Sequence, residues 1–287
     1  MFDAAKALRL LTHVLPHVPP SLAYRFCEGA AVLAPGMPAW SAVKANMQHV
    51  RPEAGAEEVR KLARGVFVNL LKNYYDLLRA HTIHPAQLDA LYQIEGLENA
   101  RRALARGKGI IAVTLHSGNY SLAFEPIARA LDIQLFVVVE QMTDPAVHTL
   151  LNTLRRREHV TLVPVDHSVT RRILQTLRAG GAVVLAQDRL VAAASTTIDF
   201  FDAPVDLPVG AATLALRTGA SLLPVYVSRC PDNRSRVMID PPLQPAGGPT
   251  PAAAAHATTA GVIRVLEAYI RSDPSQWLLT NAVWGIT

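Results

Sequence analysis

The chain has 287 residues, of which 50% are hydrophobic and only 18% are charged. This composition excludes an intrinsically disordered chain and supplies enough apolar side chains for a large core, in one domain or in a domain with a substantial cap. The formal net charge of +5 suits an anionic partner such as phospholipid, nucleic acid or an acidic cofactor, and it is equally consistent with an ordinary solvated surface.

The N-terminal segment predicts neither a membrane span nor a secretory leader. It never reaches an uninterrupted apolar run of about 18 residues, the length at which a transmembrane helix is expected. Asp3, His13 and His17, together with several prolines, interrupt the apolar region that a cleavable signal peptide requires. Cys27 and Cys230 form no CxxC pair, so we expect a reducing compartment without a disulfide framework or a zinc site.

Residues 1–92 are predicted to form a helical N-terminal region. Apolar residues at helical spacing occur in three stretches, 8–15, 21–34 and 56–79. Prolines end the first two stretches, and the third carries basic residues away from its apolar stripe. An amphipathic helix with basic flanks can bind anionic lipid headgroups or pack on its own domain, and the pattern leaves both interpretations open.

Residues 93–287 are predicted to form an α/β core, because short β-branched apolar runs alternate with helical segments there. The predicted strands are 109–115, 133–139, 160–163, 182–186, 196–201, 221–227 and 236–240. The predicted helices are 120–131, 144–158, 168–179, 208–218 and 252–272. We therefore expect a mainly parallel sheet flanked by helices, joined to the helical N-terminal region in one integrated domain.

His116 directly follows a predicted buried strand and precedes a turn into a helix. Gly118 permits unusual backbone angles in that turn, and Asn119 is a good N-cap residue. Ligands of open α/β sheets bind where strand ends meet helix starts, and a histidine there is suited to act as a general base. Backbone amides near Gly118 and Asn119 are suited to stabilise a developing negative charge. A structural histidine bonded to a loop is the alternative.

Several other chemistries are not supported by the sequence. It contains no GxSxG nucleophile elbow, no P-loop and no dinucleotide-binding fingerprint. His148 and His159 belong to no HExxH motif or close Cys/His cluster, so we expect polar surface roles for them and no metal site. Basic residues are dispersed and aromatic residues make up only 6%, which argues against nucleic-acid binding.

Four motifs together resemble a known family. They are the segment His116-Ser117-Gly118-Asn119-Tyr120-Ser121, the pair Val139-Glu140 with Arg155 downstream, the run Ala186-Gln187-Asp188-Arg189, and the stretch from Ile198-Asp199-Phe200-Phe201 to Pro224-Val225. In this order they resemble the bacterial lipid A biosynthesis acyltransferases of the glycerolipid acyltransferase superfamily, and in particular the phosphatidylinositol mannoside acyltransferases. The resemblance extends over nearly the whole chain.

The resemblance implies transfer of a fatty acyl group to a hydroxyl of a membrane glycolipid, with His116 as general base. The donor would be acyl-coenzyme A or acyl carrier protein, acting as a substrate, and no cofactor is implied. Residues 1–92 would bind the membrane and help to form the acyl groove, with the protein held peripherally at the cytoplasmic face of the bacterial inner membrane. The substrate-binding positions implied are Gly118, Asn119, Glu140, Arg155, Asp188 and Arg189. Arg156 and Arg157, by contrast, are expected only to complement the end of a helix.

The acidic residue that the family carries five positions after its histidine is replaced here by Ser121. Ser121 is a candidate catalytic residue, since a serine hydroxyl can fix the histidine tautomer. It supplies no charge, so it would stabilise the imidazolium less than an acid does. Glu125, Glu140 and Asp188 are candidate replacements for the missing acid. The alternative function is that of a catalytically silent, lipid-binding homologue.

Overall fold

The computed structural model describes residues 4–190 and 194–284 as an α/β fold around a seven-stranded sheet. The strand order is β1-β9-β8-β2-β5-β3-β4, and β8, β2, β5, β3 and β4 are mutually parallel. The bounds of these five are β2 (Ile110–Thr114), β3 (Leu135–Val139), β4 (Val160–Pro164), β5 (Ala182–Ala186) and β8 (Ser221–Arg229). The predicted mainly parallel sheet flanked by helices is confirmed.

At one edge of the sheet two strands run the other way. Strand β9 (Ser235–Ile239) pairs antiparallel with β8, and β1 (Tyr92–Glu95) pairs parallel with β9. The predicted strand at 196–201 lies outside this sheet, because β6 (Ser195–Phe200) forms a separate antiparallel hairpin with β7 (Ala203–Pro208). The sequence did not predict β7, since its two prolines are typical of a loop.

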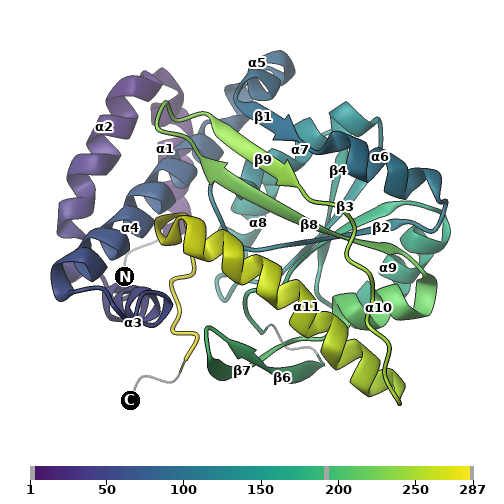
Figure 1. Cartoon of the computed structure of the whole chain (residues 1–287). Coiled ribbons are helices and arrows are strands. Elements are labelled where there is room, and N and C mark those ends of the chain that lie inside the picture. The colour runs from purple at the N-terminus through teal and green to yellow at the C-terminus, as the bar shows by residue number, and fades with distance from the viewer. Residues whose placement is uncertain (1–3, 191–193, 285–287) are drawn as a thin grey trace.

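Helices cover both faces of the sheet, and the N-terminal helices gather at one side of it (Figure 1). The N-terminal helices are α1 (Ala4–Val14), α2 (Pro20–Ala30), α3 (Trp40–Val50) and α4 (Ala56–Leu78). The others are α5 (Pro85–Ala90), α6 (Leu97–Ala105), α7 (Tyr120–Leu131), α8 (Pro145–Arg155), α9 (Val169–Arg178), α10 (Gly210–Thr218) and α11 (Pro251–Ser272). The sequence did not predict α3, α5, β1 or α6 as separate elements. Within the described residues, no helix is both long and apolar enough to cross a lipid bilayer.

Alternate residues of each central strand enter two different cores. Ile111 and Val113 of β2 pack in a core with side chains of α3, α4, α9, α10 and α11. Ile110 and Ala112 point to the other face, where α6, α7 and α8 cover the sheet. All five residues of β2 are buried, as expected for a parallel strand covered on both faces. The face under α7 and α8 carries the cavity described below.

Candidate active site

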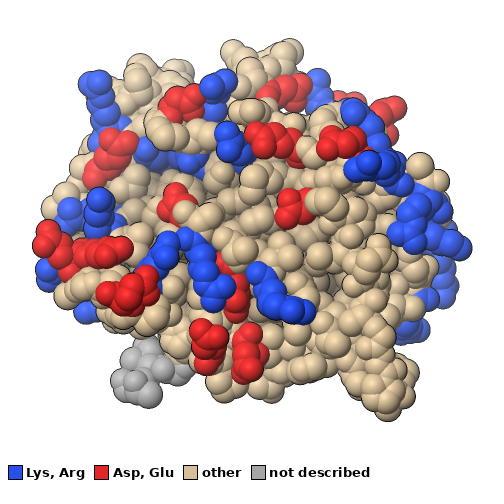
Figure 2. Space-filling model, in the orientation of Figure 1, with Lys and Arg blue, Asp and Glu red and all other residues tan. Residues whose placement is uncertain are grey.

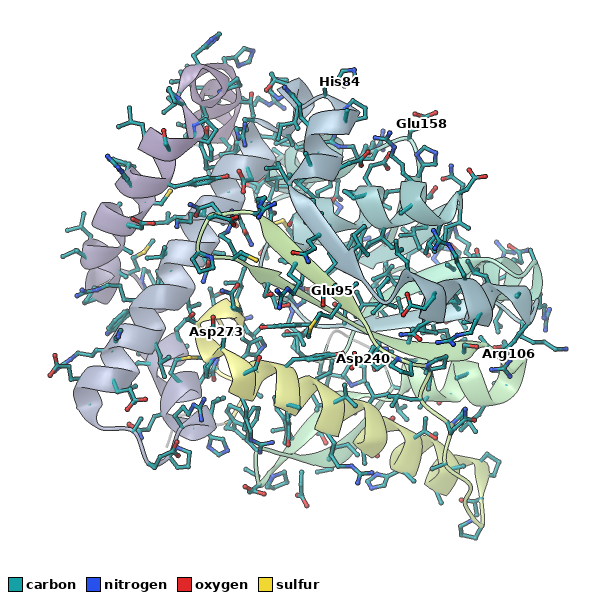
Figure 3. The ribbon with its side chains drawn as sticks, turned by 45° about the horizontal axis from the view of Figure 1, so that its top comes forward. His84, Glu95, Arg106, Glu158, Asp240 and Asp273 are labelled. Carbon is teal, nitrogen blue, oxygen red and sulfur yellow. The ribbon has the colours of Figure 1, made fainter. Side chains whose placement is uncertain are left out.

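His116 lies just beyond the carboxyl end of β2, where the fold holds its backbone on two sides. Its carbonyl accepts a hydrogen bond of 2.7 Å from the amide of Leu278. The next residue, Ser117, forms a β-bridge with Trp277. Residues 277–278 follow a short 3-10 helix, Pro274–Gln276. Asp273, which comes directly after α11, caps the start of this 3-10 helix (Figure 3). The end of the chain therefore fixes the histidine at the edge of the sheet.

Asp188 is the carboxylate that holds the His116 side chain. It comes two residues after β5, which pairs directly with β2 in the sheet. Its Oδ1 lies 2.9 Å from His116 Nδ1, and its Oδ2 accepts bonds from the His116 amide at 2.9 Å and from Trp277 Nε1 at 3.0 Å. Since Nδ1 faces a carboxylate, the neutral imidazole carries its proton there and presents a lone pair at Nε2.

Asp188 has no solvent-exposed surface, and its environment keeps it ionised. Burial by itself would raise the pKa of Asp188. Electrostatic interaction with His116 and the hydrogen bonds from His116 and Trp277 outweigh that effect and hold the pKa of Asp188 below its usual value. An ionised carboxylate beside His116 is suited to stabilise an imidazolium ion.

The other acids that the sequence offered as partners of His116 are engaged elsewhere. Glu125 accepts bonds from the Nδ1 and the amide of His159, at 2.9 and 3.0 Å. Glu140 forms an ion pair with Arg189. Of the three candidate acids, the one in contact with His116 is Asp188. Ser121 lies on the cavity wall, and its proposed catalytic role stays a prediction.

Gly118 and Asn119 form the buried support of the histidine loop. The amide of Gly118 donates to the Gln276 carbonyl at 3.1 Å, so it already has a partner. Gly118 has a φ of +50°, and a Cβ there would lie 2.5 Å from the carbonyl oxygen of Val227. The Asn119 side chain donates to Asp76 at 3.0 Å. Neither residue is among those that line the cavity. Their contacts give them a supporting position, and their role in substrate binding stays a prediction.

A buried ionic network that the sequence did not predict lies behind this loop. Asp76 of α4 accepts a bond of 2.8 Å from Arg229, and the side chains are 2% and 3% exposed. Tyr24 of α2 donates to the other oxygen of Asp76 at 2.8 Å. Arg229 also bonds Asn73, whose amide reaches the carbonyl of Gly118. The network thus joins the N-terminal helices to the loop that carries His116.

A cavity of about 320 Å³ begins at His116 and extends under α7 and α8. Its deeper walls come from α7, α8, and strands β3, β4 and β5; they are mainly apolar, with Glu125 and Arg157 as polar exceptions. Leu70 and Tyr74 of α4 form part of another wall, so both parts of the chain contribute to one cavity. Such a space fits a hydrocarbon chain with its reactive end at the sheet edge.

Cationic side chains also reach this cavity. Arg155, Arg157 and Arg189 line it, and the Nε atoms of Arg155 and Arg189 are buried without a partner among the described residues. Buried guanidinium donors of this kind are suited to an anionic group such as phosphate. Asp188 and Arg189 do not pair with each other, since Asp188 holds His116 and Arg189 holds Glu140.

Residues 8–284 match the family model described as "Bacterial lipid A biosynthesis acyltransferase". The chain belongs to this family. The family is thus described by acyl transfer in the biosynthesis of lipid A.

Similar curated proteins carry the name phosphatidylinositol mannoside acyltransferase. Two Mycobacterium tuberculosis proteins, from strains CDC 1551 / Oshkosh and ATCC 25618 / H37Rv, are each 29% identical over 143 residues, 49% of this chain and 44% of theirs. A Mycolicibacterium smegmatis (strain ATCC 700084 / mc(2)155) protein is 20% identical over 187 residues, 64% of this chain and 61% of its own. The aligned part thus spans about half of the relatives' length.

In this family member, two residues near the end of α8 differ from the sequence prediction, which placed Arg157 at the end of a helix and His159 at the surface. Helix α8 ends at Arg155 rather than near residue 158, because Arg156 adopts an extended backbone. Arg157 therefore turns inward, lines the cavity and donates to the Ala80 carbonyl at 3.0 Å. His159 binds the buried Glu125, so the prediction of a plain surface histidine was wrong. Among the described residues, no group of three or more His, Cys, Asp or Glu side chains is placed to hold a metal ion.

Proposed function

We propose that this chain transfers a fatty acyl group from a thioester, acyl-coenzyme A or acyl carrier protein, to a hydroxyl of a membrane glycolipid. The observation that carries the proposal is the hydrogen bond between His116 and the fully buried Asp188 at the mouth of a largely apolar cavity. Asp188 supplies the charge that Ser121 lacks, which favours an active enzyme over a catalytically silent, lipid-binding homologue.

The reaction proceeds by direct transfer. His116 Nε2 takes the proton of the acceptor hydroxyl as its oxygen attacks the thioester carbonyl. The tetrahedral intermediate then collapses, the carbon–sulfur bond breaks, and the imidazolium returns the proton to the thiolate that leaves. The products are an ester of the glycolipid and a free thiol. Asp188 stabilises the imidazolium formed midway, and the cavity holds the acyl chain.

The cationic side chains have a separate task in this proposal. Arg155 and Arg189 bind phosphate, either of the lipid headgroup or of the donor, through guanidinium groups that still have unpaired donors. Glu140 holds Arg189 in position through their ion pair. The names of the similar mycobacterial proteins make a mannosylated phosphatidylinositol the first acceptor to test.

The N-terminal helices are proposed to place the protein peripherally on the cytoplasmic face of the inner membrane. The exposed apolar side chains of α1, α2 and the segment 31–37 that follows α2 are Leu10, Leu11, Val14, Leu22, Phe26, Val32, Leu33 and Met37. Phe26 and Leu33 are 74% and 76% exposed. Arg9 on α1 and Arg25 on α2 are exposed as well. Helix α2 lies at the outer side of the molecule (Figure 1). An apolar surface flanked by cations suits an anionic lipid interface.

Charge elsewhere on the surface is mixed rather than concentrated. Over the face that carries α11, acidic and basic side chains are interspersed, and Lys and Arg gather mainly at the edge near α6 and α9 (Figure 2). This distribution favours local contact through the N-terminal helices over broad electrostatic attraction by that face.

Labelled acyl donors and a membrane lipid extract test the transfer. Wild type is expected to label a lipid with at least one of the two donors, and His116→Ala to abolish the label. His256→Ala is the matched control, because His256 is exposed and its side chain contacts Thr196, away from the cavity. A wild-type protein that binds lipid but leaves both thioesters intact would establish the silent homologue instead.

Co-sedimentation with anionic liposomes tests the membrane surface. The double variant Phe26→Glu/Leu33→Glu is expected to bind at least about tenfold more weakly, because burying such a side chain contributes about 1.5–3 kcal/mol. The control is Leu216→Glu, which changes an exposed leucine on α10, at the opposite end of the molecule from α2 (Figure 1). If the double variant bound anionic liposomes as strongly as Leu216→Glu and wild type do, the proposed surface would be contradicted.

A further inference from the structure

We propose that Phe124 limits the length of the acyl chain, because it separates the cavity beside His116 from a second cavity deeper on the same face of the sheet. This inference rests on the acyl transfer proposed above and concerns the specificity of that site. It follows from the linings of the two cavities, which have Phe124 and Val184 in common.

The strands show that the second cavity continues the first. On β5, Ala186 lines the first cavity, Val184 lines both, and Ala182 lines the second. On β2, Thr114 lines the first cavity, and Ala112 and Ile110 line the second. Residues two apart on a strand share a face and advance by about 6.6 Å. The second cavity therefore lies further from His116 in the direction in which an acyl chain would extend.

Residues of helix α7, which covers the sheet, line the two cavities in the same order along the helix. Tyr120 and Ser121 line the first cavity, Phe124 lines both, and Ile127 and Leu131 line the second. This spacing of three and four residues places them on one helix face. Phe124 is only 8% exposed, so its ring is held between α7 and the sheet. Val184 forms the floor at this level, and Phe124 closes the space from the helix side.

The second cavity is chemically suited to a hydrocarbon end. Its volume is about 30 Å³, and all of its lining side chains are hydrocarbon. A water molecule has no polar side-chain partner there, and apolar cavities of this kind stay dry and accept apolar groups. The cavity is too small for several methylene groups while Phe124 is in place. Removal of the Phe124 ring would join the two spaces.

The other inner wall of the first cavity carries polar groups, so a longer acyl chain is not expected to extend in that direction. Glu125 and Arg157 line the cavity on the α8 side, and Glu125 is already bonded to His159. A terminal methyl group pressed against these groups would displace their polar contacts at a free-energy cost. The apolar way onward for a longer chain therefore passes Phe124.

The test compares wild type with Phe124→Ala on saturated acyl donors of increasing length. Phe124→Ala is expected to shift the preferred donor to a longer chain and to raise kcat/KM for the first over-long donor by about tenfold, relative to the wild-type optimum. Ile127→Ala is the matched control, because it enlarges only the second cavity and leaves Phe124 in place. Its chain-length preference is expected to stay that of wild type.

Filling the second cavity provides a further check. In the Phe124→Ala background, Ala112→Leu is expected to return the preference to shorter donors, because Ala112 lines only the second cavity. Transfer by Phe124→Ala with the wild-type preference, in a protein with a wild-type circular dichroism spectrum, would overturn the proposal. If Phe124→Ala does not fold, Phe124→Leu carries the same test with a smaller change in volume.

Fatty acid binding tests the role of Phe124 without requiring acyl transfer, so it distinguishes a failure of this proposal from a failure of the proposed function. If wild type transfers no acyl group, displacement of a fluorescent fatty acid by unlabelled acids of increasing length still reports the depth of the cavity. A shift to longer acids in Phe124→Ala would support the separating role of Phe124 without acyl transfer. The same ranking in both proteins would overturn it.

Discussion

Asp188→Asn is the substitution that examines the candidate active site most directly. It preserves the shape of the side chain but leaves one oxygen and one NH₂ group where the carboxylate has two oxygens. The Oδ2 position accepts from both the His116 amide and Trp277 Nε1, so the remaining oxygen is expected to stay there. The new NH₂ group then faces His116 Nδ1.

An NH₂ group in that position reverses the tautomer of His116. Nδ1 must accept a hydrogen bond, so the proton moves to Nε2 and the lone pair needed by the acceptor hydroxyl is lost. In serine proteases the equivalent change lowers kcat about 10⁴-fold with the geometry intact. We expect a loss of kcat of about 10³–10⁴-fold here, with a much smaller change in KM.

The assay is steady-state transfer from a labelled acyl donor, together with a thermal unfolding curve for each variant. Ser121→Ala is the comparison, since Ser121 lines the same cavity but does not bond Asp188. We expect it to lose less than about tenfold, as the His116–Asp188 pair is untouched. The reasoning would be refuted if Asp188→Asn, still folded, kept more than about one tenth of wild-type kcat.

Three further predictions concern stability. Arg229→Met should lower the free energy of unfolding by about 3–5 kcal/mol in denaturant titration, because it leaves Asp76 buried without its cationic partner; a loss below about 1 kcal/mol would contradict this account of the network. Gly118→Ala should destabilise by more than about 1 kcal/mol because of its positive φ and the close Val227 carbonyl, whereas Gly261→Ala, inside α11 with open space around it, should be stabilising by about 0.5–1 kcal/mol. The lowered pKa of Asp188 means that its charge stabilises the fold fully above about pH 3.9, the unfolded value, and that this contribution is lost as the pH falls through the folded pKa. Denaturant midpoints of wild type and Asp188→Asn should therefore converge as the pH is lowered, and a constant difference would argue against an ionised Asp188.

The central strands could be predicted from the sequence because their burial is local in origin. Strands β2 and β5 are continuous runs of small and β-branched apolar residues, typical of parallel strands covered on both faces. The elements that were missed lack such a signal. Strand β1 has only four residues at the sheet edge, and β7 contains two prolines and is ordered by its pairing with β6.

The sequence also determined the place of His116, since a histidine that directly follows a buried parallel strand must lie at the carboxyl edge of the sheet. It could not determine the acid, because Asp188 is 72 residues away and the chain forms β3 and β4 before it returns to β5. The tertiary structure decided this by inserting β5 between β2 and β3. Glu125 had the right helical spacing, but the packing of α7 turns its carboxylate to His159. Periodicity is a property of neighbouring residues, whereas sheet order and helix rotation are set by the packing of the whole chain.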